Sequence, residues 1–189
     1  TQSNLNNKLV PSDGAANDNF GHGGAALTSD GLVFSACSYG DGNNGATNSG
    51  SCYVCNRADI TTDFVWTTAN CHKLVPSDGA ADNKFGLGGP ALSSDGLVFS
   101  ACSHDDDDNG KVIGSCYVCD RADTATELVW ASDCHKLVPS DGAENDKFGF
   151  GGAALSSDGL VFSACSLHVD EHGSNSGSCY VCDRPSTTT

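Results

Sequence analysis

The feature that most constrains this chain is one long sequence written three times. "KLVPSDGAANDNFGHGGAALTSDGLVFSACS" begins at Lys8, and near-copies begin at Lys73 and Lys136. The copies start 65 and 63 residues apart, and most of the variation lies in one polar loop after "SACS". A constant framework with one drifting loop indicates a small structural unit stacked on itself. We therefore expect three units, 1–72, 73–135 and 136–189, of which the third lacks its outer strand.

Each unit predicts four antiparallel β-strands and no helix. In the first unit the strands are expected at 20–27, 32–37, 51–55 and 64–75, with a tight Asp-Gly hairpin turn at 29–31. The first strand is rich in small residues, which suits a place where backbones approach closely. Four such strands in about 60 residues are typical of a β-propeller blade, and closed propellers need about four to eight blades. The predicted fold class is therefore all-β, with three blades that do not close within one chain.

Three motifs in each unit resemble the FG-GAP repeat, which is the blade of integrin-α-type β-propellers and their microbial relatives. They are "SDGAANDNFG", "SDGLVFSAC" and "GSCYVCNR" in the first unit, and the Phe-Gly pairs begin at Phe20, Phe85 and Phe148. The resemblance covers nearly the whole chain. It implies a propeller-type fold and an extracellular role in adhesion or scaffolding.

The family often carries a calcium loop of Asp-x-Asp-x-Asp-Gly type, and this chain has no faithful copy of it. "DDDDNG" at 105–110 is the nearest match, so the calcium candidates are Asp105, Asp107 and Asn109. Hard cations need about 6–8 oxygen ligands in fixed positions. A solvated acidic loop is the other interpretation, and no further cofactor is expected.

The 11 cysteines are dense for a cytosolic protein and ordinary for an extracellular one. In "SCYVC" the Cys-x-x-Cys spacing falls on a strand, where residues i and i+3 point to opposite faces, unlike a zinc knuckle or a redox site. The Cys-His steps at 71–72 and 134–135 keep zinc as an alternative. We predict the structural disulfides Cys37–Cys52, Cys102–Cys116, Cys165–Cys179, Cys55–Cys71 and Cys119–Cys134.

Four cysteines in a unit allow three pairings, so this disulfide scheme is a hypothesis. Simple counting of register places Cys71 nearer Gly50 than Cys55, so the second kind of bridge requires a bulge. Cys182 is left odd, and it is free, paired outside the chain or engaged in a link between subunits.

The two ends of the sequence suggest assembly. Lys8 matches Lys73, so the N-terminal segment supplies the end of an outer strand, whereas the third unit passes from "SCYVCDR" into "PSTTT". An open strand edge favours pairing with another chain, and such a head-to-tail contact gives a ring or a filament. A fragment of a longer propeller is the alternative. The expected assembly strand, which completes the third blade of the next copy, is Leu5, Asn6, Asn7, Lys8, Leu9 and Val10.

Composition narrows the partners and the location. Nine basic against 24 acidic residues give a net charge of −15, which argues against nucleic acid or anionic lipid as a partner. No apolar run approaches the roughly 20 residues of a membrane span, so no membrane insertion is expected. The absence of methionine indicates a processed chain, and we expect a secreted, cell-surface protein. The Ser/Thr tail after Pro185 is typical of a stalk with O-glycosylation, at Ser186, Thr187, Thr188 and Thr189, and a frayed end is the other interpretation.

No pattern in the chain indicates catalysis, and we expect no enzyme. Of the six histidines only His72 and His135 share a repeat position. The aspartates of "PSDGA", at 13, 78 and 141, are interpreted as turn formers that bond their own backbone. Trp66 and Trp130 are interpreted as packing anchors, or as a stacking platform for sugars.

The function that these patterns favour is structural: a subunit of an extracellular fibre, appendage or surface coat, built head to tail from copies of itself. The alternative is an adhesive or lectin-like module that engages carbohydrate or protein. It would use the variable loops 38–49, 103–113 and 166–176, because loops that vary on a fixed frame are typical of binding.

Overall fold

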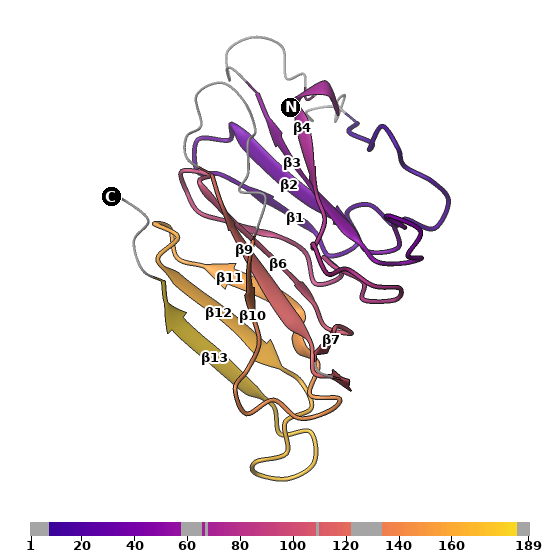
Figure 1. The fold of residues 1–189 in the computed structure, drawn as a ribbon. Helices are drawn as coiled ribbons and strands as arrows, with labels where there is room; N and C mark the ends of the chain where they lie inside the picture. Colours follow the sequence, from indigo (N-terminus) through magenta and orange to yellow (C-terminus); the bar gives the residue numbers. More distant parts are fainter. Residues whose placement is uncertain (1–7, 58–65, 67, 109, 122–133, 185–189) are drawn as a thin grey trace, which may run out of the picture.

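The computed structural model describes residues 8–57, 66, 68–108, 110–121 and 134–184, and these residues form antiparallel sheets. The three larger sheets have the orders β1-β2-β3-β4, β10-β9-β6-β5 and β11-β12-β13, and β7 and β8 form a small hairpin in a variable loop. Figure 1 shows the second sheet between the first and the third. This arrangement confirms an all-β fold of three blade-like units that do not close within the chain. The elements are β1 (Ala25–Leu27), β2 (Val33–Ser38), β3 (Ser51–Asn56), η1, a 3₁₀ turn (Thr68–Asn70), β4 (Cys71–Leu74), β5 (Ala91–Leu92), β6 (Val98–Ser103), β7 (Asp107–Asp108), β8 (Lys111–Val112), β9 (Ser115–Asp120), β10 (His135–Leu137), β11 (Phe148–Leu155), β12 (Val161–Ser166) and β13 (Ser178–Asp183).

The Asp-Gly turn explains how the first two strands of each unit become a hairpin. In the first unit the Asp30 carboxylate accepts hydrogen bonds from the Thr28 hydroxyl at 2.6 Å and the Leu32 N–H at 2.9 Å. Gly31 follows with a φ of 68°, a left-handed conformation that favours glycine. The same turn recurs at Asp95 and Asp158. The local sequence therefore sets the register of this hairpin.

The predicted small-residue strand at 20–27 is shorter than expected. β1 covers only Ala25–Leu27, and the segment before it bends at Gly21 and Gly24, whose φ values are 82° and 87°. In the third unit the corresponding β11 runs from Phe148 to Leu155, with a register shift inside it. The glycines thus make a bent segment where an uninterrupted strand was expected.

The outer strand also differs from the prediction. β4 begins at Cys71, directly after the 3₁₀ turn η1, whereas a strand from residue 64 was expected. Residues 58–65 and 67 lie outside the described residues. Because the strand starts late, Cys71 lies directly opposite Cys55, and the β3–β4 pairing runs from Cys52↔Leu74 to Cys55↔Cys71 without a break. The expected bulge at this bridge is therefore wrong.

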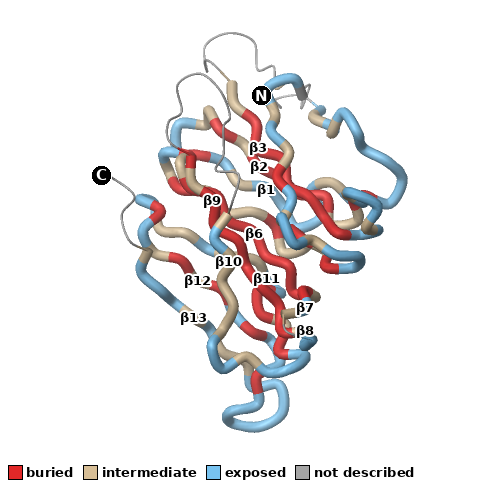
Figure 2. The backbone as a smooth tube through the Cα atoms, viewed as in Figure 1, coloured by how far each residue is buried: buried red, intermediate tan, exposed pale blue. Residues whose placement is uncertain are grey.

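The hydrophobic core lies between the blades, in two separate clusters. The first joins β2 and β3 to the second unit through side chains such as Val54, Phe85 and Phe99. The second joins the second sheet to the third through side chains such as Val118, Phe148 and Phe162. Figure 2 shows the corresponding buried stretches along β2, β3, β6 and β9. Since each cluster needs two blades, a blade is stabilised mainly by its neighbour.

The third blade has one uncovered side. β3 and β9 are buried along almost their whole length, whereas β13 is exposed or half-buried throughout. Val181 is 69% exposed, although its counterparts Val54 and Val118 are 0% and 1% exposed. The edge of β13 in Figure 2 is accordingly blue. An apolar strand of this kind normally lies under a further layer of structure.

Candidate functional site

The cysteines form five disulfides in the described residues. They are the same five pairs that the sequence predicts: Cys37–Cys52, Cys55–Cys71, Cys102–Cys116, Cys119–Cys134 and Cys165–Cys179. Each closes a loop with a sequence separation of 14 to 16 residues. The paired sulfurs are therefore not thiolate ligands for zinc. His72 and His135 directly follow Cys71 and Cys134, and both of these cysteines are bridged. Cys182 is an exposed free thiol on β13, at the position of Cys55 and Cys119.

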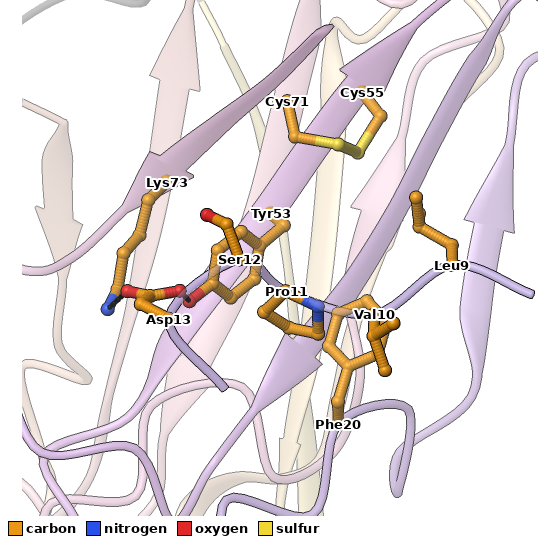
Figure 3. A pocket seen from close by; sticks show the side chains of 10 residues that line it. All are labelled: Leu9, Val10, Pro11, Ser12, Asp13, Phe20, Tyr53, Cys55, Cys71 and Lys73. Carbon is orange, nitrogen blue, oxygen red and sulfur yellow. Dashed lines mark hydrogen bonds and ion pairs between the residues drawn. A yellow bond between two sulfur atoms is a disulfide. The ribbon is translucent and has the colours of Figure 1, made fainter. Parts of the chain in front are cut away.

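A partly buried contact between tyrosine, aspartate and lysine recurs beside the outer strand, and the sequence patterns did not predict it. In the first unit the Tyr53 hydroxyl donates to Asp13 Oδ1 at 2.7 Å, and Lys73 Nζ lies 2.7 Å from Asp13 Oδ2. Lys73 Nζ also lies 2.6 Å from Asp41, which is buried. Figure 3 shows the Asp13 carboxylate between Lys73 and Tyr53. These three residues line a cavity of about 100 Å³, and Cys55 and Cys71 line another part of it.

The second unit repeats this arrangement with tighter burial. The Tyr117 hydroxyl donates to Asp78 at 2.8 Å and to Asp106 at 3.1 Å. Lys136 Nζ lies 2.7 Å from Asp78 and 2.8 Å from Asp106. In both units the tyrosine comes from the third strand, the lysine from the fourth strand, and one aspartate from the loop that leads into the unit. The contact therefore fastens the outer strand and the crossing loop to one blade.

The electrostatics of the first contact follow from its burial and its partners. The hydrogen bond from Lys73, followed by the one from Tyr53, lowers the pKa of Asp13. Burial, followed by the bond to Asp13, raises the pKa of Tyr53 to about 12. Burial alone would lower the pKa of Lys73, but Asp13 and Asp41 outweigh it and raise that pKa. The Lys73 ammonium, the Asp13 carboxylate and the neutral Tyr53 phenol are thus the stable forms at neutral pH.

In the third unit the same contact lacks its lysine among the described residues. The Tyr180 hydroxyl donates to Asp141 at 3.0 Å, and Val169 stands where Asp41 and Asp106 stand in the other units. The surroundings form an open hollow of about 450 Å³ that is rich in carboxylates. Asp146, Asp170 and Glu171 line it together with Asp141 and Tyr180. We call this hollow the lysine seat, because a lysine amine occupies the equivalent place in both other units.

The "PSDGA" aspartates lie in turns, as the sequence predicts, but the interpretation of them as turn formers alone is incomplete. Their carboxylates accept hydrogen bonds from a tyrosine 39 or 40 residues later in the chain. The signal that points to this contact is the recurrence of Asp, Tyr and Lys at equivalent positions, as in Asp78, Tyr117 and Lys136. Asp-Gly is so strong a turn signal that it hides a longer-range role.

The calcium candidates do not form a cluster of ligands in the described residues. Asp105 is bound by two amines, Lys84 at 2.7 Å and Lys147 at 2.5 Å, and the nearby His104 lies 3.2 Å away. Asp107 lies in the hairpin strand β7, and Asn109 lies outside the described residues. No group of three or more His, Cys, Asp or Glu side chains that could hold a metal ion occurs in the part of the chain that the structure describes. The cation that Asp105 holds is lysine.

The remaining candidates are packing residues where the structure describes them. Trp66 lies against Phe34, with ring centroids 5.7 Å apart, and under the Arg57 guanidinium at 5.2 Å. His22 contacts the ring of Tyr39 at 5.0 Å. Trp130, the expected assembly residues Leu5, Asn6 and Asn7, and the expected glycosylation sites 186–189 lie outside the described residues, so those predictions stand as they were made.

These stacked four-stranded blades, in which a disulfide joins the outer strand to its neighbour, define a propeller-type repeat protein. The sequence pattern of the FG-GAP repeat matches residues 4–55, 68–119 and 131–182, which is most of the chain. The chain belongs to the FG-GAP repeat family. A search of curated proteins finds no match.

Family and composition suggest a propeller-like extracellular or adhesion module. Five disulfides fit an extracellular protein, because such bridges persist in oxidising surroundings. The described residues include no helix with the length and apolar character needed to cross a membrane.

Proposed function

We propose that the protein is a structural subunit of an extracellular fibre, appendage or surface coat, in which copies join head to tail by strand addition. The observation that carries this proposal is the open edge of β13. The equivalent strands β3 and β9 pair with β4 and β10, whereas β13 pairs only with β12 in the described residues. A long unpaired edge with an exposed valine favours pairing with another strand.

The strand proposed to fill this edge is the N-terminal segment 5–10 of a second copy. Lys8, Leu9 and Val10 repeat the Lys73, Leu74 and Val75 that end and follow β4. In the first sheet Lys73 lies opposite Tyr53. The same register places Lys8 of the second copy opposite Tyr180.

Charge supports the same partner. Lys8 is exposed, and the lysine seat presents Asp141 with Tyr180 already bonded to it. In the other two units a lysine Nζ lies 2.7 Å from the equivalent aspartate. An ammonium group from a second copy therefore completes a contact that the fold builds twice within the chain.

Charge reversal tests this proposal. Wild type, K8E, D141K and the double variant would be examined by electron microscopy and sedimentation velocity, unreduced and untagged. We expect wild type to form assemblies, K8E and D141K to lose them, and the double variant to regain them, because it restores the pair across the joint. K111E is the control, since Lys111 is an exposed lysine on β8 and its reversal changes the net charge equally.

Deleting residues 1–10 removes the whole proposed strand and should also abolish assembly. Assembly of K8E or of the deletion variant at the wild-type level would contradict strand addition. A wild-type protein that stays monomeric at high concentration would contradict the structural role itself.

The second candidate function is a carbohydrate-binding or adhesive module, with no catalytic step. The observation in its favour is that the three variable loops differ in structure as well as in sequence. The loop at 103–113 contains the β7–β8 hairpin, whereas the loop at 38–49 contains only the isolated bridge Asn43↔Ala46. Selective sugar binding by discrete particles on a glycan array would favour this module over a fibre.

A further inference from the structure

Gly23 and Gly88 lie where one unit packs on the next. A Cβ atom at Gly23 would lie 2.2 Å from the backbone nitrogen of Gly89, and one at Gly88 would lie 2.2 Å from that of Gly152. Neither Gly23 nor Gly88 has a positive φ. The close approach of two backbones is therefore what requires glycine at these positions.

Gly151 is the third member of this series, and nothing in the described chain requires it to be glycine. Its φ is not positive, and a Cβ atom there would have no neighbour within 4 Å. Gly24, the counterpart of Gly89 and Gly152, is likewise open, with no atom within 4 Å of a Cβ. The third unit thus presents one half of this glycine contact, and the first unit presents the other half.

The Phe-Gly steps show the same division. Gly86 packs on the Cys37–Cys52 bridge of the preceding unit, where a Cβ atom would lie 2.4 Å from the Cβ of Cys37. Gly149 packs in the same way on Cys102 and Cys116. In contrast, the bridge Cys165–Cys179 is exposed, and Gly21 has no atom within 4 Å of a Cβ. The first unit again carries the covering glycine, and the third unit carries the uncovered disulfide.

Charged side chains follow this pattern too. Arg184 of the third unit binds Asp120 of the second through both carboxylate oxygens, at 2.8 and 2.7 Å. Arg121 reaches back to Asn56 of the first unit at 3.3 Å. Arg57 is the equivalent of Arg121 and Arg184 in the first unit, and Asp183 is the equivalent of Asn56 and Asp120 in the third. The same contact between two copies would therefore join Arg57 of one copy to Asp183 of the other, which is exposed at the end of β13. An Arg57–Asp183 pair between copies would thus repeat the contacts that Arg121 and Arg184 make between units.

We infer that the first unit of one copy packs face to face on the third unit of another, with Gly24 and Gly21 against Gly151 and the Cys165–Cys179 bridge. The joint between copies then reproduces the joints between units. This inference rests on the proposed head-to-tail assembly and adds to it, because strand addition at β13 needs no contact at Gly151. The contact is heterologous, since different faces of the two copies meet.

The variant G151V tests this joint. Within one copy the valine has space and an acceptable backbone conformation, so its melting temperature should equal that of wild type. At the joint its side chain would collide with the backbone of the second copy, so purified G151V should not assemble. G88V is the control for the same change inside the chain, where the collision with Gly152 should lower the melting temperature of the monomer.

Mixing provides a readout that misfolding would not produce. G151V keeps an intact first unit, so it should add to the exposed third unit of a growing wild-type assembly and then block further growth. Substoichiometric G151V should therefore shorten wild-type filaments, or reduce the number of closed rings, in electron micrographs.

Normal assembly of G151V, with K8E still defective, would overturn the packed joint and leave strand addition in place. If G151V and K8E both assembled like wild type, the packed joint and strand addition would both be overturned. A G151V that fails to assemble and also fails to shorten wild-type filaments would overturn the joint as well, since the intact first face should still dock.

Discussion

The tyrosine hydroxyls of the second and third units offer a comparison of one contact in two environments. Tyr117 is 3% exposed, and its hydroxyl donates to Asp78 at 2.8 Å and to Asp106 at 3.1 Å. Tyr180 is half-buried and makes only the 3.0 Å bond to Asp141, which is exposed to solvent. Replacing each tyrosine by phenylalanine removes one oxygen atom and leaves the ring in place.

The expected magnitudes follow from this difference. Hydrogen bonds to charged groups contribute about 1.5–3 kcal/mol when buried. Asp106 keeps bonds from Asn83, Ser115 and Lys136, so we place the cost of Y117F near the middle, at about 2 kcal/mol. Exposed substitutions usually stay within about 0.5 kcal/mol, which sets the expectation for Y180F in an isolated copy. At this chain length, 2 kcal/mol corresponds to a melting temperature about 4–8 °C lower.

Thermal unfolding of unassembled, disulfide-intact protein, followed by near-ultraviolet circular dichroism, would measure both variants. Equal losses in Y117F and Y180F would refute the reasoning, because burial would then not decide the value of the contact. In assembled protein, where the lysine seat is filled, Y180F should cost about 1.4 kcal/mol, less than Y117F, because Val169 offers Tyr180 no second acceptor. The critical concentration for assembly should then rise about tenfold.

Two further predictions concern the first blade. Replacing Cys55 and Cys71 together by alanine should lower the free energy of unfolding by about 3 kcal/mol, because the bridge no longer restricts the unfolded chain. Urea denaturation of the variant and of the intact chain would measure this difference. Stability should also fall between about pH 10 and 12, because the pKa values of Tyr53 and Lys73 are raised in the folded protein. Their contribution is complete below the unfolded pKa values and disappears as pH rises through the folded ones. A Y53F variant with an unchanged alkaline transition, measured by fluorescence at constant salt, would exclude Tyr53 as a cause.

The strands and disulfides were predictable because their determinants are local. Asp-Gly turns fix the hairpins, and the same-face position of Cys37 and Cys52 on adjacent strands follows from where each strand begins and ends. The start of β4 was not predictable in this way, because the 3₁₀ turn at Thr68–Asn70 has no distinctive residue signal. That turn sets the register of the Cys55–Cys71 bridge, so the register was wrong although the pairing matches.

The contact of tyrosine, aspartate and lysine was missed for a different reason. Asp13 and Tyr53 are 40 residues apart, and only the fold shows that the crossing loop lies against the third strand. Turn propensity explains Asp-Gly without any partner, so the local pattern gave no reason to look further. The repeat offered the missing signal, because Lys, Asp and Tyr recur at equivalent positions and nearly constant spacing, within the constant segments "KLVPSDGA" and "GSCYVC".

Comparing equivalent positions in the three units also distinguishes residues needed for packing between units from residues that can vary. The position of His22 holds leucine and phenylalanine in the other units, and Asp41 gives way to Val169 in the third. The third unit has therefore diverged from the first where the fold allows it. Gly151 has not diverged, although a Cβ atom there would have no described atom of its own chain within 4 Å. The joint proposed between copies would account for glycine at this position, because the two internal joints show the same close approach of backbones at Gly23 and Gly88.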